Sequence, residues 1–372
     1  MFTPRSRHQL ARILLVAAVL FGAISTAAGK GRSAPPPLAE TPTPMQVFGV
    51  WHCGNHYCDW NEEVDTVAFA ETNRWLLERT PGGTPAVNVV VLSFVNPLRL
   101  LKANDEGHLR MIPRGMTLGV VNYFRNAGIR VMLSIGGITY TDDWDAALAE
   151  DPTQLGLNAA QVAQDLGVGI EIDYENSSSP NIEALETFIA AYRSVHPYDP
   201  TGTRPAARLT IDVAAGDRWL IALNRYATQN WLDPANPVLD YANAMVSGTS
   251  SGTPTDWQEH VDGKPQYAPP VPPLAPARFT GGLYLKGNSA NCLNFDASEQ
   301  KAHADYVQRV LPNATAFPAG GFTPGMLGYM FWAAGTPSAR RSYVPTTDCT
   351  GGMGVAAETF KIPVPMPALR QR

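Results

Sequence analysis

The chain has 372 residues, and 45% of them are hydrophobic, enough for one large barrel or two smaller domains. Charged residues make up 16%, the formal net charge is −5, and no run of lysine or arginine occurs. This composition excludes a chain that is disordered throughout and argues against a protein that binds nucleic acid.

Residues 1–28 are predicted to be an export signal. Basic residues precede an apolar run from Ile13 to Ile24, and the small residues at 25–28 offer a cleavage site. The alternative is an uncleaved membrane anchor, but the run is shorter than the ~20 residues that a spanning helix needs. We therefore expect a secreted protein, extracellular or periplasmic, without membrane contact after signal removal. A Pro-rich linker follows over residues 29–45.

From residue 46 onward, apolar runs alternate with helical patterns. Most runs are continuous Val, Ile and Leu segments, as expected for a parallel sheet covered on its outer face. The strand candidates are Gln46–Trp51, Val87–Phe94, Arg130–Ile135, Gly169–Asp173, Arg208–Val213, Tyr241–Val246, Arg278–Tyr284 and Gly328–Trp332. Eight strands with helices between them predict an α/β fold, a (β/α)8 TIM barrel over residues 46–372. A doubly wound open sheet is the alternative.

The helix candidates are Leu118–Phe124, Asn158–Leu166, Ile182–Tyr192, Trp219–Ala227 and Glu299–Leu311. Ser179 is the predicted N-cap of the third, with Pro180 at the first helical position. Residues 248–277 are rich in Pro, Gly and Ser and show little helical periodicity. We expect an irregular loop to replace the sixth helix there and to line a cleft.

Four cysteines in an exported chain indicate two disulfides. Cys53 with Cys58 would close a short loop and leave Cys292 with Cys349, but the sequence does not fix this pairing. Free buried cysteines are the alternative. The C-x4-C spacing has no histidine pattern around it and is a poor zinc signal. We expect no metal and no other cofactor.

Three carboxylates, Glu171, Asp173 and Glu175, occupy alternate positions at the end of the fourth predicted strand. Alternate side chains share one face of a strand, so the acids point the same way, with neighbours ~6.5 Å apart. Ile170 and Ile172 on the other face indicate burial on both sides, which argues against a solvated edge strand. Repulsion raises at least one pKa and keeps one acid protonated beside an ionised one. The pattern predicts acid-catalysed cleavage of a glycosidic bond.

The stretch Gly169–Glu175 resembles the fourth-strand motif D-G-x-D-x-D-x-E of glycoside hydrolase family 18, the chitinases and related endo-N-acetylglucosaminidases. Residues 134–137 match the family's third-strand S-x-G-G, and Trp332 matches its aromatic residue on the last strand. The three motifs occur in the family's order.

The resemblance implies a retaining, substrate-assisted mechanism. Glu175 would protonate the glycosidic oxygen, the sugar's own 2-acetamido carbonyl would attack the anomeric carbon, and Glu175 would then act as base toward water. Asp173 would hydrogen-bond the acetamido N–H and balance the developing charge. Glu171 stands where the family has an inner aspartate, and Ser134 would support the inner carboxylates.

The resemblance also implies substrate-binding positions. Trp332 would form the floor under the sugar at the cleavage point, and Trp51, at the end of the first strand, is the next candidate. Gly136 and Gly137 would permit a turn that leaves room for substrate. Asp212, ending the fifth strand, is predicted to face the cleft mouth, where it contacts substrate or makes a structural hydrogen bond.

The sequence departs from the family's pattern at three places. Val168 replaces its first aspartate, and Glu171 adds a methylene to the inner acid. The sixth strand reads Met245 to Gly248 where the family has Met-x-Tyr-Asp, so Ser247 replaces the tyrosine that bonds the acetamido carbonyl. Tyr284 on the seventh strand is a candidate substitute.

The roles of several other residues can be interpreted in two ways. Four tryptophans could be sugar platforms or core packing: Trp60, Trp144, Trp219 and Trp257. His52 is expected in a loop or at the surface. Asn176 begins an N-glycosylation triplet beside the proposed acid, which we interpret as a chance occurrence.

The sequence therefore predicts a secreted, monomeric, chitinase-like hydrolase of β-1,4-linked N-acetylglucosamine polymers. One alternative is an endo-β-N-acetylglucosaminidase acting on N-glycan cores. Another, which the missing tyrosine favours, is a catalytically weak protein that binds chitin or another glycan. An acidic divalent-metal site is a distant third reading, because no histidines accompany the acids.

Overall fold

The computed structural model describes residues 47–54, 58–77, 85, 87–102, 111–245, 254–284 and 326–335. Several predictions fall outside these residues, namely the signal and linker (1–45), Ser247, the helix at 299–311, and Cys292 with Cys349. The side chain of Tyr284 is also not described. Cys53 and Cys58 form the predicted disulfide.

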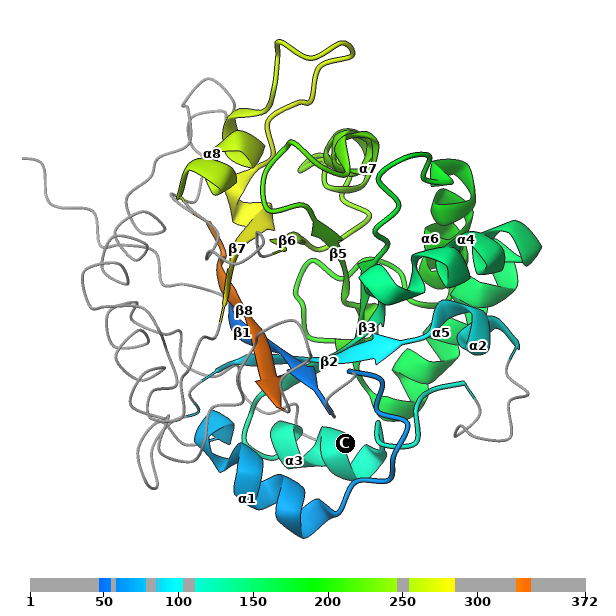
Figure 1. Cartoon of the computed structure of the whole chain (residues 1–372), viewed down its shortest axis with the longest axis vertical. Coiled ribbons are helices and arrows are strands. Elements are labelled where there is room, and N and C mark those ends of the chain that lie inside the picture. The colour runs from blue at the N-terminus through cyan, green and yellow to red at the C-terminus, as the bar shows by residue number, and fades with distance from the viewer. Residues whose placement is uncertain are drawn as a thin grey trace, which may run out of the picture. The chain divides into compact units, whose positions relative to one another are not determined.

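Eight parallel strands close into a barrel in chain order, with β8 paired to β1 (Figure 1). The strands are β1 (Val47–Cys53), β2 (Val89–Val95), β3 (Arg130–Gly136), β4 (Gly169–Asp173), β5 (Leu209–Val213), β6 (Ala242–Ala244), β7 (Phe279–Tyr284) and β8 (Gly328–Gly335). The predicted TIM barrel is confirmed, and the open sheet is excluded.

Helices lie outside the strands (Figure 1). They are α1 (Thr66–Leu77), α2 (Pro97–Lys102), α3 (Leu118–Arg125), α4 (Thr141–Glu150), α5 (Pro152–Leu166), α6 (Ile182–Val195), α7 (Ile221–Tyr226) and α8 (Pro254–Asp262), with short turns η1 (Ile138–Tyr140), η2 (Pro205–Ala207), η3 (Ala227–Trp231) and η4 (Pro276–Arg278). Within the described ranges, no helix is both long and apolar enough to cross a bilayer.

The predicted replacement of the sixth helix by a loop is wrong for nine residues, which form α8. The inward face of this helix consists of Trp257, His260 and Val261, all at most 2% exposed. Their spacing is helical, but a histidine occupies one of the three buried positions. The apolar pattern therefore has only two members and is too weak to read.

The N-cap of α6 also differs from the prediction. The side chain of Asn181, not that of Ser179, accepts a hydrogen bond from the backbone N–H of Ala184 at 3.1 Å. This satisfies one of the free donors of the first turn. The helix begins two residues after Pro180 because the preceding serines belong to the loop that follows β4.

Packing inside the barrel changes along the strands. Toward the strand N-termini, the interior holds an apolar cluster that includes Val89, Met132 and Met330. Farther along, the interior becomes polar and buried; these residues are Ser93, Ser134, Glu171, Asp173, Thr210, Asp212, Asn243 and Thr280. Burying polar groups costs stability unless they are hydrogen-bonded. Because reacting groups in this fold lie at the strand C-termini, the polar layer marks the candidate site.

Candidate active site

The three acids at and just beyond the end of β4 lie at increasing exposure along the chain, in the order predicted. Glu171 is 0% exposed and Asp173 is 4% exposed. Glu175 follows the strand and is partly exposed. Each acid therefore has a different solvent environment, although all three belong to one short segment.

Glu171 is bonded by two donors inside the barrel. The indole N–H of Trp51 donates to Oε1 at 2.8 Å, and the amide of Asn243 donates to Oε2 at 2.5 Å. Ser134 is its register neighbour on β3 and is fully buried. Burial raises the pKa of Glu171 to about 6, although these donors oppose the shift. Because both oxygens accept hydrogen bonds, Glu171 is the acid best placed to carry charge.

Asp173 and Asp212 lack this support. Their Oδ1 atoms are buried and have no hydrogen-bond partner among the described residues. Burial, and then the charges of Glu175 and Glu171, raise the pKa of Asp173 well above its usual value. Burial and the charges of Glu171 and Asp173 do the same for Asp212, which is also hydrogen-bonded to Glu171. Burial and mutual repulsion therefore favour the proton-bound forms of these acids more than in an isolated carboxyl group.

The predicted place of Asp212 at the cleft mouth is wrong. Its side chain is 2% exposed and is hydrogen-bonded to Glu171, so the structural hydrogen bond is present, while contact with substrate stays a prediction. The strand ends at Val213 as predicted, and Asp212 is buried because its side chain lies on the inward face of β5 among the neighbouring strands.

We expect Asp212→Asn to stabilise the fold as the pH rises. The pKa of Asp212 is raised in the folded state, so its contribution to stability is complete below the unfolded value of about 3.9 and is lost as the pH rises through the folded pKa. Asparagine stays neutral and keeps the shape. The variant should gain in unfolding free energy relative to wild type between pH 4 and pH 8, measured by urea titration.

Asp199→Asn is the matched control. Burial raises the pKa of Asp199, but hydrogen bonds from Thr201 and the backbone of Arg204 lower it below its usual range. Its contribution to stability is therefore present above about pH 3.9 and is lost as the pH falls. This variant should lose stability relative to wild type as the pH rises. The same pH trend in both variants would contradict the assignment.

Trp332 lies within β8, opposite Trp51 of β1, and is partly exposed. Its ring stacks on Phe94, with centroids 5.6 Å apart and planes 24° apart, and contacts Trp51 at 6.4 Å. Trp51 itself is 3% exposed and holds Glu171 through its N–H. Sugar stacking by either tryptophan stays a prediction. Among the other tryptophans, Trp60, Trp144 and Trp257 are packed in the core and are at most 1% exposed, while Trp219 is 38% exposed.

Gly136, the last residue of β3, and Gly137 form the predicted turn, with φ of 119° and 87° respectively. The space beside them is not left for substrate, however. A Cβ on Gly136 would collide with the carbonyl of Asp173 and the indole of Trp144, and one on Gly137 would lie 2.9 Å from the ring of Phe94. The glycines permit close contact between β3, β4 and α4.

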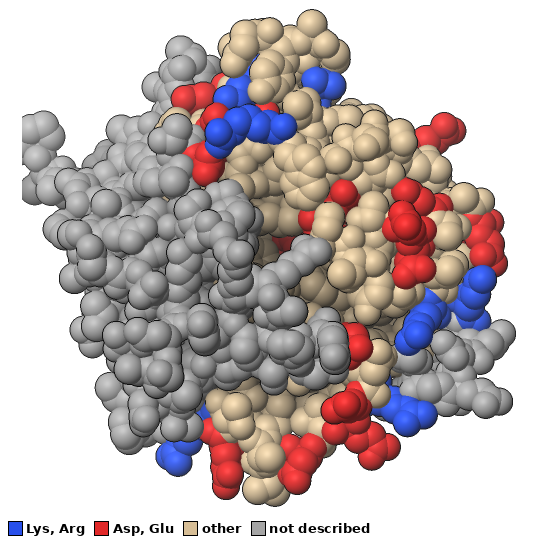
Figure 2. Space-filling view, in the orientation of Figure 1, with Lys and Arg blue, Asp and Glu red and all other residues tan. Residues whose placement is uncertain are grey.

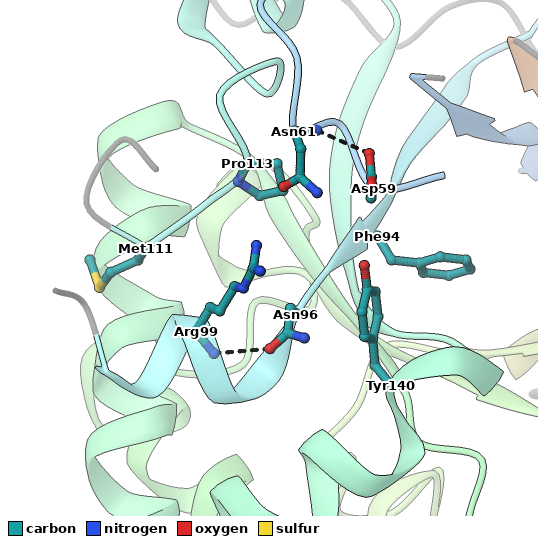
Figure 3. Close-up of a pocket in the computed structure, with 8 residues that line it drawn as sticks. All are labelled: Asp59, Asn61, Phe94, Asn96, Arg99, Met111, Pro113 and Tyr140. Atoms are coloured by element: carbon teal, nitrogen blue, oxygen red, sulfur yellow. Dashed lines mark hydrogen bonds between the residues drawn. The ribbon is translucent and has the colours of Figure 1, made fainter. Parts of the chain in front are cut away.

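A hollow of about 220 Å³, including the solvent to which it opens, lies at the C-terminal ends of β1, β2 and β3 (Figure 3). It is lined by Asp59, Asn61, Phe94, Asn96, Arg99, Met111, Pro113 and Tyr140. The ring of Phe94 that borders the hollow also stacks on Trp332. The hollow therefore adjoins Trp332 through Phe94. Its lining combines this aromatic ring with hydrogen-bonding side chains.

Among residues whose positions are described, no three His, Cys, Asp or Glu side chains are grouped so that they could hold a metal ion. On the face in Figure 2, the described lysines and arginines lie in small separate groups rather than in one basic patch.

The predicted position of His52 in a loop or at the surface is wrong. The residue lies inside β1, is 1% exposed, and its Nε2 lies 2.6 Å from Oδ1 of Asn73.

Two residues of the site were missed by sequence reasoning. Asn243 is a lone amide in a short strand. Asp145, which accepts hydrogen bonds from Tyr174 and Asn176 on either side of Glu175, is one of several acids at the start of α4. Neither has a pattern around it, and only the register of Asn243 with Asp212 on the neighbouring strand places it in the site.

No family model and no curated protein matches the sequence. The fold is similar to a family 18 chitinase from Pseudoalteromonas aurantia, with 15% identity over 84% of this chain and 99% of that chain, and a TM-score of 0.48. A chitinase from Rhizomucor miehei has 14% identity over 76% and 94%, with a TM-score of 0.44. A family 18 chitinase from Chromobacterium violaceum has 14% identity over 89% and 85%, with a TM-score of 0.42. These solved structures come from the family whose motifs the sequence resembles, and at this level the similarity concerns the fold alone.

Proposed function

We propose that the protein is a chitinase-like glycoside hydrolase that cleaves chains of β-1,4-linked N-acetylglucosamine with retention of configuration. The observation that carries the proposal is the graded burial of three acids at alternate positions, two on β4 of a closed barrel and one just beyond its end. The innermost is bonded by two donors, and the outermost is open to solvent. Such an arrangement separates the pKa values of neighbouring acids, which acid–base catalysis requires.

In the proposed first step, Glu175 donates its proton to the glycosidic oxygen. The acetamido carbonyl of the same sugar attacks the anomeric carbon, and a cyclic oxazolinium forms without a covalent bond to the protein. Asp173 accepts a hydrogen bond from the acetamido N–H and turns that group toward the reacting carbon. Positive charge then develops directly beside Asp173.

The buried acids can provide a negative charge that compensates for this positive charge. Burial, and then the charges of Glu175 and Glu171, raise the pKa of Asp173 well above its usual value and so favour its proton-bound form, while the pKa of Glu171 is raised to about 6. Glu171 is the proposed acceptor of the Asp173 proton. Transfer of that proton inward leaves a negative charge on Asp173 where the oxazolinium is positive. In the second step Glu175 removes a proton from water, the water opens the ring, and the product has the configuration of the substrate.

The surroundings support an extended sugar chain as substrate. The stacked rings of Trp332 and Phe94 offer a flat apolar surface against which a pyranose ring can lie. The adjoining hollow presents carboxylate, amide, guanidinium and phenol groups, which suit sugar hydroxyls. The predicted export signal and the Cys53–Cys58 disulfide support the proposal that the protein acts outside the cytoplasm.

The test compares three substrates that differ at the 2-position. Short chitooligosaccharides should be cleaved, while cello-oligosaccharides and fully deacetylated chitosan oligomers of equal length should not, because neither carries the participating acetamido group. Cleavage of all three would reject substrate assistance. Binding of chitooligosaccharide without cleavage would reject the enzyme in favour of a glycan-binding protein. Release of glycan from a high-mannose glycoprotein instead would identify an endo-β-N-acetylglucosaminidase.

A further inference from the structure

Side chains in the first turns of α4 contact the segment that carries Glu175. Tyr174 and Asn176 both reach the same residue of this helix, Asp145, and therefore face the same way. Tyr174 is fully buried, and its ring lies 5.7 Å from that of Trp144 on α4. The two residues that flank Glu175 in the chain are therefore the ones that contact this helix.

The carboxylate of Asp145 accepts hydrogen bonds from both side chains that flank Glu175. The hydroxyl of Tyr174 donates to Oδ1 of Asp145, and the amide of Asn176 donates to Oδ2 of the same residue at 2.8 Å. The acceptor is 29 residues from one donor and 31 from the other, so these are tertiary contacts. A carboxylate offers two acceptor atoms and no donor, which matches a hydroxyl and an amide N–H₂ on either side.

Further bonds hold the partners of Asp145 in place. The backbone N–H of Asn181 donates to the Tyr174 hydroxyl at 3.0 Å. The backbone N–H groups of Ser178 and Ser179 donate to Oδ1 of Asn176, each at 3.0 Å. Asn176 is thus bonded through both ends of its amide, which also supports the reading of its glycosylation triplet as chance.

The backbone before Glu175 is fixed by the neighbouring residue of the same helix. The indole N–H of Trp144 donates to the carbonyl of Asp173 at 3.2 Å, and the backbone N–H of Gly137 donates to that carbonyl at 3.0 Å. Trp144 therefore fixes the chain two residues before Glu175, and Asp145 fixes the side chains immediately before and after it.

We propose that Asp145 is a positioning residue that sets the orientation of Glu175 toward the glycosidic oxygen. The inference rests on the proposed function, because it assigns Asp145 to the same proton transfer. Asp145 acts through Tyr174 and Asn176 and does not itself contact substrate. Misplacing a reacting group by an ångström can cost about a hundredfold in rate.

The experiment uses a swap of donor and acceptor. Asp145→Asn keeps one acceptor for the Tyr174 hydroxyl but turns an N–H₂ group toward the N–H₂ group of Asn176, so one bond is lost. The double variant Asp145→Asn/Asn176→Asp restores an N–H···O pair with its direction reversed, and the residue at 176 can still accept from Ser178 and Ser179. Asp142→Asn is the matched control, because it removes an exposed acid from the first turn of the same helix.

We expect Asp145→Asn to lower kcat for chitooligosaccharide hydrolysis about ten- to a hundredfold with little change in KM. The double variant should recover most of that loss, and Asp142→Asn should match wild type. Wild-type kcat in the single variant, or no recovery in the double variant, would overturn the inference. A loss confined to KM would do the same, because it would indicate substrate binding.

Thermal unfolding separates folding from positioning. If Asp145→Asn unfolds, Tyr174→Phe replaces it, since this change removes only the hydroxyl donor and keeps the ring against Trp144. It should lower kcat and leave KM, and wild-type kcat in Tyr174→Phe would overturn the inference. A wild-type protein that does not hydrolyse chitooligosaccharide would refute both the proposed function and this inference. An active wild type with an equally active Asp145→Asn would remove this inference alone.

Discussion

Glu175→Gln is expected to lower kcat for chitooligosaccharide hydrolysis by about 10²- to 10⁴-fold. The amide has nearly the shape of the acid but cannot give a proton to the departing oxygen, and the charge of the sugar alkoxide then stays uncompensated. KM should change little, because the substituted group acts on the transition state rather than on the bound substrate.

Two comparisons make this prediction specific to proton donation. A reporter glycoside with an acidic aryl leaving group needs little protonation, so its cleavage should fall much less in Glu175→Gln than that of chitooligosaccharide. Glu183→Gln, at an exposed position in the first turn of α6, should leave both activities unchanged. Unreduced hydrolysis of chitooligosaccharide by Glu175→Gln would show that another group supplies the proton.

His260→Leu is expected to reduce the free energy of unfolding by about 3–5 kcal/mol. The ring of His260 is 2% exposed and lies between two acceptors, with Nδ1 3.0 Å from Oδ1 of Asp217 and Nε2 2.7 Å from the carbonyl of Ala214. Both nitrogens can donate only if the ring is the charged imidazolium. Leucine fills the volume but leaves the 1% exposed carboxylate of Asp217 without its cation.

The pH dependence of this loss has a definite sign. Burial lowers the pKa of His260, but the charge of Asp217, with hydrogen bonds and Glu259, raises it above its usual value. Its contribution to stability is therefore complete below the unfolded value of about 6.5 and is lost as the pH rises through the folded pKa.

Urea unfolding of wild type and His260→Leu between pH 5.5 and pH 9.5 measures this contribution. The difference should be largest at the acidic end and shrink toward the alkaline end. His196→Leu is the control, since His196 is partly exposed and bonds only the carbonyl of Ala160 in the described contacts, and its loss should be small. A difference that grows with pH would mean that the ring of His260 is neutral.

The barrel could be predicted from the sequence because its strands are buried on both faces. Continuous Val, Ile and Leu runs mark such strands without reference to distant residues, and all eight candidates are strands in the structure. The nine residues of α8 could not be predicted in this way. A buried histidine stands at a core position of that helix, and its burial depends on Asp217, 43 residues earlier in the chain.

The order of the acids in the site was also predictable, because alternation along β4 fixes which side chains share a face. Contacts between elements were not. Asn243 reaches Glu171 across 72 residues, and its role depends on the register of β5 with β6. The end of β5 was predicted correctly at Val213, but the burial of Asp212 depends on Glu171 and Asn243 of neighbouring strands, which the sequence does not place beside it.

The configuration of the first product tests the central claim most directly. Proton NMR of chitooligosaccharide hydrolysis by the wild-type protein, recorded faster than mutarotation, identifies the anomer at the newly formed reducing end. Attack by the sugar's own acetamido group followed by water predicts that the β anomer forms first and that α appears only by later equilibration. An initial α anomer would mean direct displacement by water, and would contradict the account.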